Sequence, residues 1–66
     1  MILGTKRLIT LKAMLAQLSH VEVEDACNLP YAAVLLASQG QDLSVWDWEF
    51  ICDAIDAWDS KGEALL

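Results

Sequence analysis

The sequence predicts an all-α domain built from four helices. Its apolar residues recur at three- and four-residue steps, which is the spacing of a helix face, and no segment alternates like a half-buried strand. Glycine, proline and asparagine fall between these periodic segments, where helices end. A chain of 66 residues has room for one small core, so we predict a single helical domain over residues 1–66.

The first two helices are marked by a leucine stripe and by a capping signal. The first helix is predicted over Thr5–Gln17, with its apolar stripe at Leu8, Leu11, Leu15 and Leu18. Ser19 is a suitable N-cap for the second helix, and Glu22 completes an S-x-x-E capping box. This helix should end near Cys27, because Asn28 tolerates the left-handed conformation that closes a helix.

Pro30 and Gly40 bracket the third predicted helix. Pro30 suits its first turn, where the missing N–H costs nothing, and Gly40 ends it. After the polar linker QGQDLS, the last helix begins near Ser44, with Asp47 in a second capping box, or at Asp47 itself. It should fray from Asp59 onward. Its predicted core residues, at helical spacing, are Trp48, Ile51, Ile55 and Trp58.

Charge is distributed unevenly along the chain. Residues 1–21 carry Lys6, Arg7 and Lys12 with no acidic residue, for a charge of +3. Residues 22–66 carry all ten acidic residues and one lysine, for −9, which gives a net charge of −6. Because nucleic-acid phosphates repel an acidic surface, this distribution argues against DNA binding by the C-terminal two-thirds.

Cysteine usage and hydropathy indicate an intracellular protein. Cys27 and Cys52 form no CxxC spacing, and we expect two reduced thiols in the core, although one bridge between them stays open. The longest apolar run, Leu29–Ala37, is much shorter than the about 20 residues that span a bilayer. Residues 1–11 lack the apolar region of a signal peptide. We therefore predict a soluble, cytoplasmic protein without a membrane segment.

Nothing in the sequence indicates catalysis. The only histidine, His20, has no nucleophile at a motif spacing apart from the adjacent Ser19, and the glycines are isolated rather than gathered in a phosphate-binding loop. The acidic residues come without the loop that completes an oxygen cage for a metal. We predict no catalytic residue, no metal and no cofactor.

Residues 18–40, LSHVEVEDACNLPYAAVLLASQG, resemble the helix-turn-helix of the phage-repressor and Cro-type family. The positions that match the family pattern, from its opening leucine–serine pair to its closing glycine, are Leu18, Ser19, Val23, Cys27, Asn28, Leu29, Val34 and Gly40. The resemblance implies a repressor-like bundle of four or five helices. It also implies that the third helix occupies the place of a DNA-recognition helix.

The positions that would contact DNA in this family carry no suitable side chain. They are Pro30, Tyr31, Ala32, Ala33, Leu35 and Leu36. Reading base edges requires groups such as Arg, Asn or Gln, and phosphate contacts require Arg, Lys or other polar groups. Two other departures are Glu24, where the family has a small buried alanine, and a longer linker after Gly40. We therefore do not expect DNA to be the ligand.

The third helix is apolar almost all round. If Val34 and Ala37 face the core, then Tyr31, Leu35 and Leu36 cannot all do so. An exposed apolar patch on a small domain usually marks an interface. The alternative is that this helix is central and buried on every side. We predict that the tyrosine and the two leucines bind a partner, with the tyrosine as an aromatic anchor.

The last helix adds an acidic stripe and an isolated tryptophan. The stripe consists of Glu49, Asp53, Asp56 and Asp59. It is either an ordinary solvated face or a surface that meets basic residues of a partner, in the extreme case by imitating DNA phosphates. Trp46 is predicted to lie at the rim of an interface, or else to pack against the linker.

These observations predict a small acidic protein-protein interaction module of the kind carried by phages and mobile elements. It would bind and inhibit a transcription regulator or another nucleic-acid-binding protein, as an antirepressor does. One alternative is a Cro-like repressor that contacts phosphates through Lys6, Arg7 and Lys12. Another is a DNA mimic that acts through the acidic last helix alone. A homodimer through the third or the last helix is compatible with the main prediction.

Overall fold

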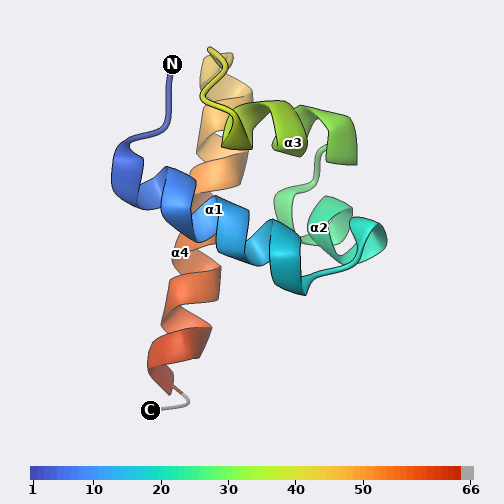
Figure 1. The fold of residues 1–66 in the computed structure, drawn as a ribbon, viewed down its shortest axis with the longest axis vertical. Coiled ribbons are helices and arrows are strands. Elements are labelled where there is room, and N and C mark those ends of the chain that lie inside the picture. Colours follow the sequence, from blue (N-terminus) through green and yellow to red (C-terminus); the bar gives the residue numbers. More distant parts are fainter. Residues whose placement is uncertain (65–66) are drawn as a thin grey trace.

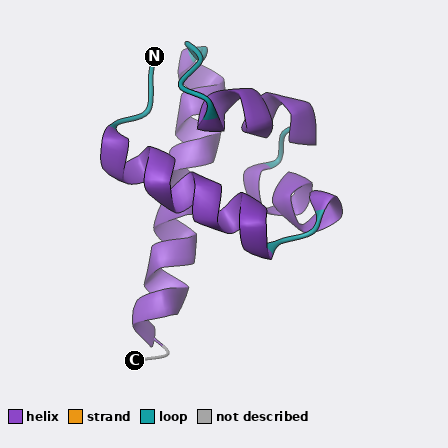
Figure 2. Cartoon of the chain, in the orientation of Figure 1, coloured by secondary structure: helices purple, strands orange, loops and turns teal. Residues whose placement is uncertain are grey.

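The computed structural model contains four helices where the sequence predicts them (Figure 1). The structure describes the backbone of residues 1–64 and the side chains of residues 1–61. The helices are α1 (Thr5–Gln17), α2 (His20–Cys27), α3 (Tyr31–Ser38) and α4 (Val45–Ala64). Within residues 1–64 the remaining segments are turns and loops, with no strand, so the all-α prediction is confirmed (Figure 2). The predicted fraying from Asp59 is wrong as far as Ala64, where α4 ends.

The helices are arranged around the crossing of α1 and α4. α1 crosses α4 near its middle, and the C-terminal half of α4 extends beyond α1 on the side away from α3 (Figure 1). α3 packs against α1 and α2, and α4 packs against the same two helices. The radius of gyration is 10.9 Å, close to the about 11 Å expected for a compact chain of this length.

All four helices contribute side chains to the core. The largest fully buried side chains are Leu11, Met14, Val23, Cys27, Val34, Ile51 and Ile55. Met14 was not part of the predicted leucine stripe, of which only Leu11 is fully buried. Trp48 and Trp58, both predicted to be core residues, are half-buried and pack against its edge. The helical periodicity therefore found the inward faces but overestimated the burial of the two tryptophans.

Local hydrogen bonds define both ends of α2, as predicted. The Ser19 hydroxyl accepts the Glu22 backbone N–H at 3.3 Å, and the Glu22 carboxylate accepts the Ser19 backbone N–H at 3.1 Å. These hydrogen bonds lower the pKa of Glu22, because they favour its charged form. At the other end, Asn28 adopts the left-handed conformation, with φ 54° and ψ 37°. The chain can therefore turn sharply into α3.

The ends of α3 and the start of α4 also follow sequence signals. Pro30 lies immediately before α3 rather than in its first turn, and Gly40 has a φ of 85°, which few other residues adopt. The Ser44 hydroxyl accepts the Asp47 backbone N–H at 3.2 Å. Of the two predicted starts of the last helix, the one at Ser44 is correct.

The first residues lie against the linker between α3 and α4. The Leu43 backbone N–H donates to the Met1 carbonyl at 2.7 Å. Leu3, two residues later, is buried in the core. This contact was not predicted, and it holds the linker beside the segment that leads into α1.

Candidate interaction surfaces

The outward face of α3 is apolar. Val34 and Ala37 point into the core, whereas Leu35 is 39% exposed and Leu36 is 50% exposed. Ala32, one turn before Leu36, is also exposed, and the buried Ser38 hydroxyl is satisfied by donating to the Leu35 carbonyl at 2.6 Å. The reading in which α3 is buried on every side is therefore wrong. We call Ala32, Leu35 and Leu36 the α3 apolar face.

Tyr31 is less available than predicted. Its side chain is half-buried and its ring stacks on the His20 imidazole, with ring centres 3.8 Å apart and planes at 15°. One face of the tyrosine ring is thereby covered by the first residue of α2. The stack joins the two helices at their N-terminal ends, so Tyr31 is at most an edge of the α3 apolar face and not a free aromatic anchor.

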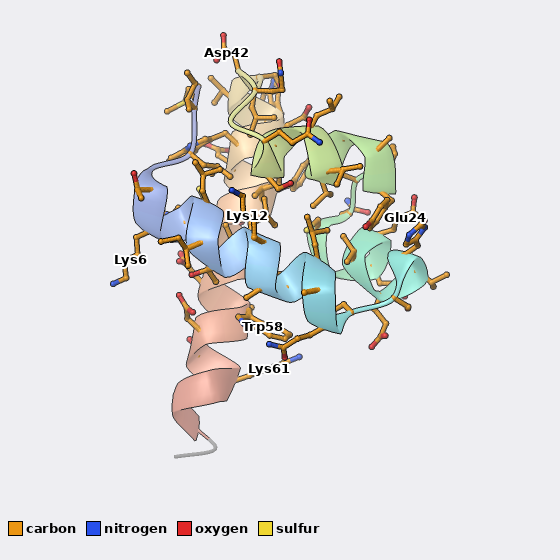
Figure 3. The ribbon with its side chains drawn as sticks, in the orientation of Figure 1. Lys6, Lys12, Glu24, Asp42, Trp58 and Lys61 are labelled. Carbon is orange, nitrogen blue, oxygen red and sulfur yellow. The ribbon has the colours of Figure 1, made fainter. Side chains whose placement is uncertain are left out.

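Glu24 caps α3 from the neighbouring helix. Its carboxylate accepts the Tyr31 backbone N–H at 2.9 Å. Pro30, the residue before α3, has no side-chain acceptor with which to cap it, and a carboxylate is favoured at the positive end of a helix. Glu24 is exposed and lies near the start of α3 in Figure 3. The residue that departs from the repressor-like pattern therefore has a structural role in positioning the α3 apolar face.

The outward face of α4 combines aromatic and acidic side chains. Trp46 is 72% exposed, as predicted, and Phe50, one turn later, is 40% exposed. Glu49 and Asp53 are exposed at positions that place them on the same side of the helix. Phe50 was missed by the sequence reasoning, although its four-residue distance from Trp46 was a usable signal. We call Trp46, Glu49, Phe50 and Asp53 the α4 aromatic–acidic face.

The other two predicted acidic residues lie beside cations of the same chain. Asp56 and Asp59 line a hollow of about 260 Å³ together with Lys6 and Arg7 of α1. Figure 1 shows this part of α4 extending beyond α1, away from α3. The structure therefore does not bring Asp56 and Asp59 together with the α3 apolar face, and this half of the predicted acidic stripe borders cations of α1.

Arg7 is largely occupied within the fold. Its guanidinium carbon lies 5.8 Å from the centre of the Trp48 ring, a cation–π distance. Its Nε atom is buried and has no hydrogen-bond partner among the described residues. Of the three cations that a DNA-binding alternative requires, only Lys6 and Lys12 are exposed.

A larger hollow, of about 430 Å³, opens between the C-terminal end of α1, α2 and α4. Apolar side chains and charges of both signs line it, among them Met14, Leu18, Glu22, Asp25, Trp58 and Lys61. Figure 3 shows Trp58 and Lys61 on one side of α4, beneath the end of α1. No sequence prediction addressed this hollow, because it forms only where three helices meet.

The described side chains show no arrangement suited to metal chemistry. Among them no three His, Cys, Asp or Glu residues lie close enough to hold a metal ion.

Cys27 and Cys52 are both buried and unbridged, as the thiol prediction required. Burial raises the pKa of the Cys27 thiol, because it disfavours the charged thiolate. Across residues 1–64, none of the helices is both long and apolar enough to cross a membrane.

No protein-family model matches the sequence, and no match is found among curated proteins or solved structures. The resemblance of residues 18–40 to a repressor helix-turn-helix therefore depends on those residues alone.

Proposed function

We propose that this protein is an interaction module that docks the α3 apolar face on a nucleic-acid-binding regulatory protein and inhibits it. The observation that carries the proposal is the exposure of Leu35 and Leu36 on a helix whose neighbouring outward residue, Ala32, is also apolar. Burying a leucine stabilises a complex by about 1.5–3 kcal/mol, and a short helix with an apolar face suits a groove on a partner.

The charge of the chain supports a basic partner. The net charge of −6 repels nucleic acid and attracts basic proteins, and Glu49 and Asp53 present acidic groups on the outward side of α4. Proteins that bind nucleic acids carry basic surfaces for that purpose. We further propose that α2, the turn and α3 are related to a repressor helix-turn-helix of a phage or mobile element, with base-reading groups replaced by apolar ones.

The two alternatives receive less support from the described side chains. A DNA mimic needs a surface of uncompensated negative charge, but Asp56 and Asp59 lie beside Lys6 and Arg7. A Cro-like repressor needs cations and polar groups around α3, where Leu35 and Leu36 are exposed instead. The apolar docking proposal uses the groups that α3 presents.

The first experiment identifies the partner and the contact together. A photo-crosslinking amino acid is placed at Leu36 and, as a matched control, at Gln17, which is exposed at the end of α1. We expect a regulator from the native host to be captured at position 36 and not at position 17. The purified partner is then titrated with the unmodified protein and with variants.

Affinity measurements then separate docking from mimicry. Leu36→Asp should weaken binding of the purified partner at least about tenfold, since it replaces apolar burial worth more than 1.4 kcal/mol. Gln17→Asp adds the same charge elsewhere and should have little effect. The DNA-mimic alternative would be favoured over apolar docking by the opposite result. In that case Leu36→Asp keeps its affinity, and affinity is lost in the triple variant Glu49→Gln, Asp53→Asn, Asp56→Asn. A sequence-preferring gel shift with DNA would replace docking by the repressor alternative.

A further inference from the structure

We propose that this chain associates with copies of itself head to tail, α1 of one copy docking on the α4 aromatic–acidic face of the next. The inference does not rest on the proposed function, because it concerns the protein alone and uses neither Leu35 nor Leu36. It is carried by the complementary chemistry of two outward helix faces and by the directions in which they point.

The outward face of α1 is basic around an apolar centre. Ile9 is 65% exposed, and Lys6 and Lys12 are exposed three residues before and after it. Side chains three residues apart on an α-helix are offset by about 60° around its axis, so the two lysines lie on either side of the isoleucine. Figure 3 shows Lys6 and Lys12 projecting from α1 in different directions. We call Ile9 and the two lysines the α1 basic face.

The α4 aromatic–acidic face has the matching pattern. Trp46 and Phe50 offer aromatic surface for an isoleucine, and Glu49 and Asp53 offer carboxylates for the flanking lysines. A tryptophan ring also attracts an ammonium group directly. At a rise of 1.5 Å per residue, Lys6 to Lys12 spans about 9 Å and Trp46 to Asp53 about 10.5 Å. The two faces are thus of similar length.

The fold prevents one molecule from closing this contact on itself. α1 packs on α4 with buried side chains of both helices, among them Leu11 and Ile51, on the sides that meet. Their outward faces therefore point away from each other, with α1 crossing in front of α4 in Figure 1. Lys6 lies at the edge of the α1 basic face, where it also lines the hollow with Asp56 and Asp59 of its own chain. Ile9 and Lys12 can reach an α4 aromatic–acidic face only on another copy. Such a contact is heterologous, so it builds rows or rings rather than a two-fold dimer.

The net charge of −6 opposes association but does not prevent it. At physiological ionic strength the Debye length is about 8 Å, so charges far apart on two copies are screened while those in contact attract. The interface is small, which predicts weak and concentration-dependent association. The contact leaves the α3 apolar face free, so one chain can dock on a partner and associate with a copy.

Sedimentation equilibrium over rising protein concentration tests the proposal at physiological salt. We expect the mean mass of the unmodified chain to rise beyond that of a dimer. Two charge-reversed variants remove one face each: an α1 variant (Lys6→Glu, Lys12→Glu) and an α4 variant (Glu49→Lys, Asp53→Lys). Each should associate at least about tenfold more weakly than the unmodified chain. Circular dichroism shows whether the variants fold. Because Lys6 lies beside Asp56 and Asp59, the single variant Lys12→Glu, which leaves that hollow unchanged, is measured as well and should also weaken association.

Mixing and combining the variants supplies the decisive controls. An equimolar mixture should associate again, because the altered α1 face matches the altered α4 face and the unaltered faces match each other. The chain with all four changes should also associate, and it keeps the original net charge. The α4 variant has less net charge than the unmodified chain, so its loss of association cannot come from general repulsion.

Three results would overturn the proposal. They are a monomeric unmodified chain throughout the concentration range, association that survives both charge reversals, and a mixture that stays monomeric. Leu36→Asp should leave association unchanged. If Leu36→Asp alone loses association, the contact between copies is a dimer through α3 and the head-to-tail proposal is wrong. The docking proposal is tested separately, by the affinity of the purified partner.

Discussion

α3 and α4 follow one another in the chain but are stabilised in different ways. α3 has 8 residues and takes its N-terminal cap from Glu24 of α2, whereas α4 has 20 residues and is capped by the adjacent Ser44. Isolated helices shorter than about 12 residues are marginal in water. α3 therefore depends on its neighbours for its existence as a helix, and α4 depends on them mainly for its position.

The two helices also differ in how clearly a polar outward face is separated from an apolar buried face. α4 separates its faces clearly, with Ile51 and Ile55 inward and Trp46, Glu49 and Asp53 outward. α3 is apolar on both sides, so its own sequence does not say which side is buried. Only contact with α1 and α2 decides that Val34 faces the core and Leu36 faces outward.

The largest expected effect comes from truncating the core side of α4. Ile51→Ala should lower the free energy of unfolding by about 2–5 kcal/mol, because Ile51 is fully buried. A domain of this size is stabilised by only about 3–5 kcal/mol, so the variant should be largely unfolded. Circular dichroism with urea titration measures this. Trp46→Ala, at an exposed site, should change the value by no more than about 0.5 kcal/mol.

The turn that orients α3 should give the next largest effect. Asn28→Ala should lower the free energy of unfolding by about 1–2 kcal/mol, since the residue is left-handed with φ 54°. Asn28→Gly removes the steric cost and should be at least as stable as the unmodified chain. Urea titrations of the two variants in parallel measure the difference. Equal stability of the two would show that the turn does not require this conformation.

The two N-terminal caps test the comparison directly. Glu24→Ala and Ser44→Ala should each lower the free energy of unfolding by about 1 kcal/mol. Hydrogen exchange should differ, with faster exchange at the Tyr31 amide in the first variant and at the Asp47 amide in the second. Asp25→Ala, an exposed acidic residue of α2, is the control. If Glu24→Ala leaves the Tyr31 amide protected, α3 does not depend on α2 for its cap.

The smallest expected effect is the loss of stability at acidic pH that comes from the capping box of α2. The pKa of Glu22 is lowered below its ordinary value of 4.5 in the fold by its hydrogen bonds to Ser19. Its contribution to stability is therefore present above about pH 4.5 and is lost as pH falls through the lowered value. An NMR titration should find the pKa of Glu22 below 4.5, and higher in Ser19→Ala. Because alanine keeps the backbone N–H that bonds the Glu22 carboxylate, an unchanged Glu22 pKa in that variant would show that the Ser19 hydroxyl does not contribute to the shift.

Several elements followed from local signals alone. The Ser19–Glu22 capping box, the left-handed Asn28 and the start of α4 after Ser44 each involve residues within one helical turn, and all three predictions are confirmed. The buried positions Ile51 and Ile55 were also predicted from helical spacing. Such signals are readable because the interacting groups are neighbours in the chain.

Contacts between elements were not predictable in the same way. The Glu24 carboxylate on the Tyr31 amide, the stack of His20 on Tyr31 and the position of Arg7 over Trp48 each join different segments. The placement of Asp56 beside Lys6 is of the same kind. Nothing in residue spacing indicates which side chains meet once helices pack.

The sequence by itself determined the bounds of α1 and α2 and the start of α4 near Ser44, and it determined that charge is basic at the N-terminal end and acidic elsewhere. Capping, glycine conformation and helical periodicity are local, so the neighbouring residues suffice to specify them. Only the tertiary structure decided that Leu35 and Leu36 face outward and that Asp56 and Asp59 border cations of α1. It also left Ile9 of α1 and Trp46 of α4 exposed. The physical reason is that packing selects the buried side of each helix, and an apolar helix such as α3 offers more than one side to bury.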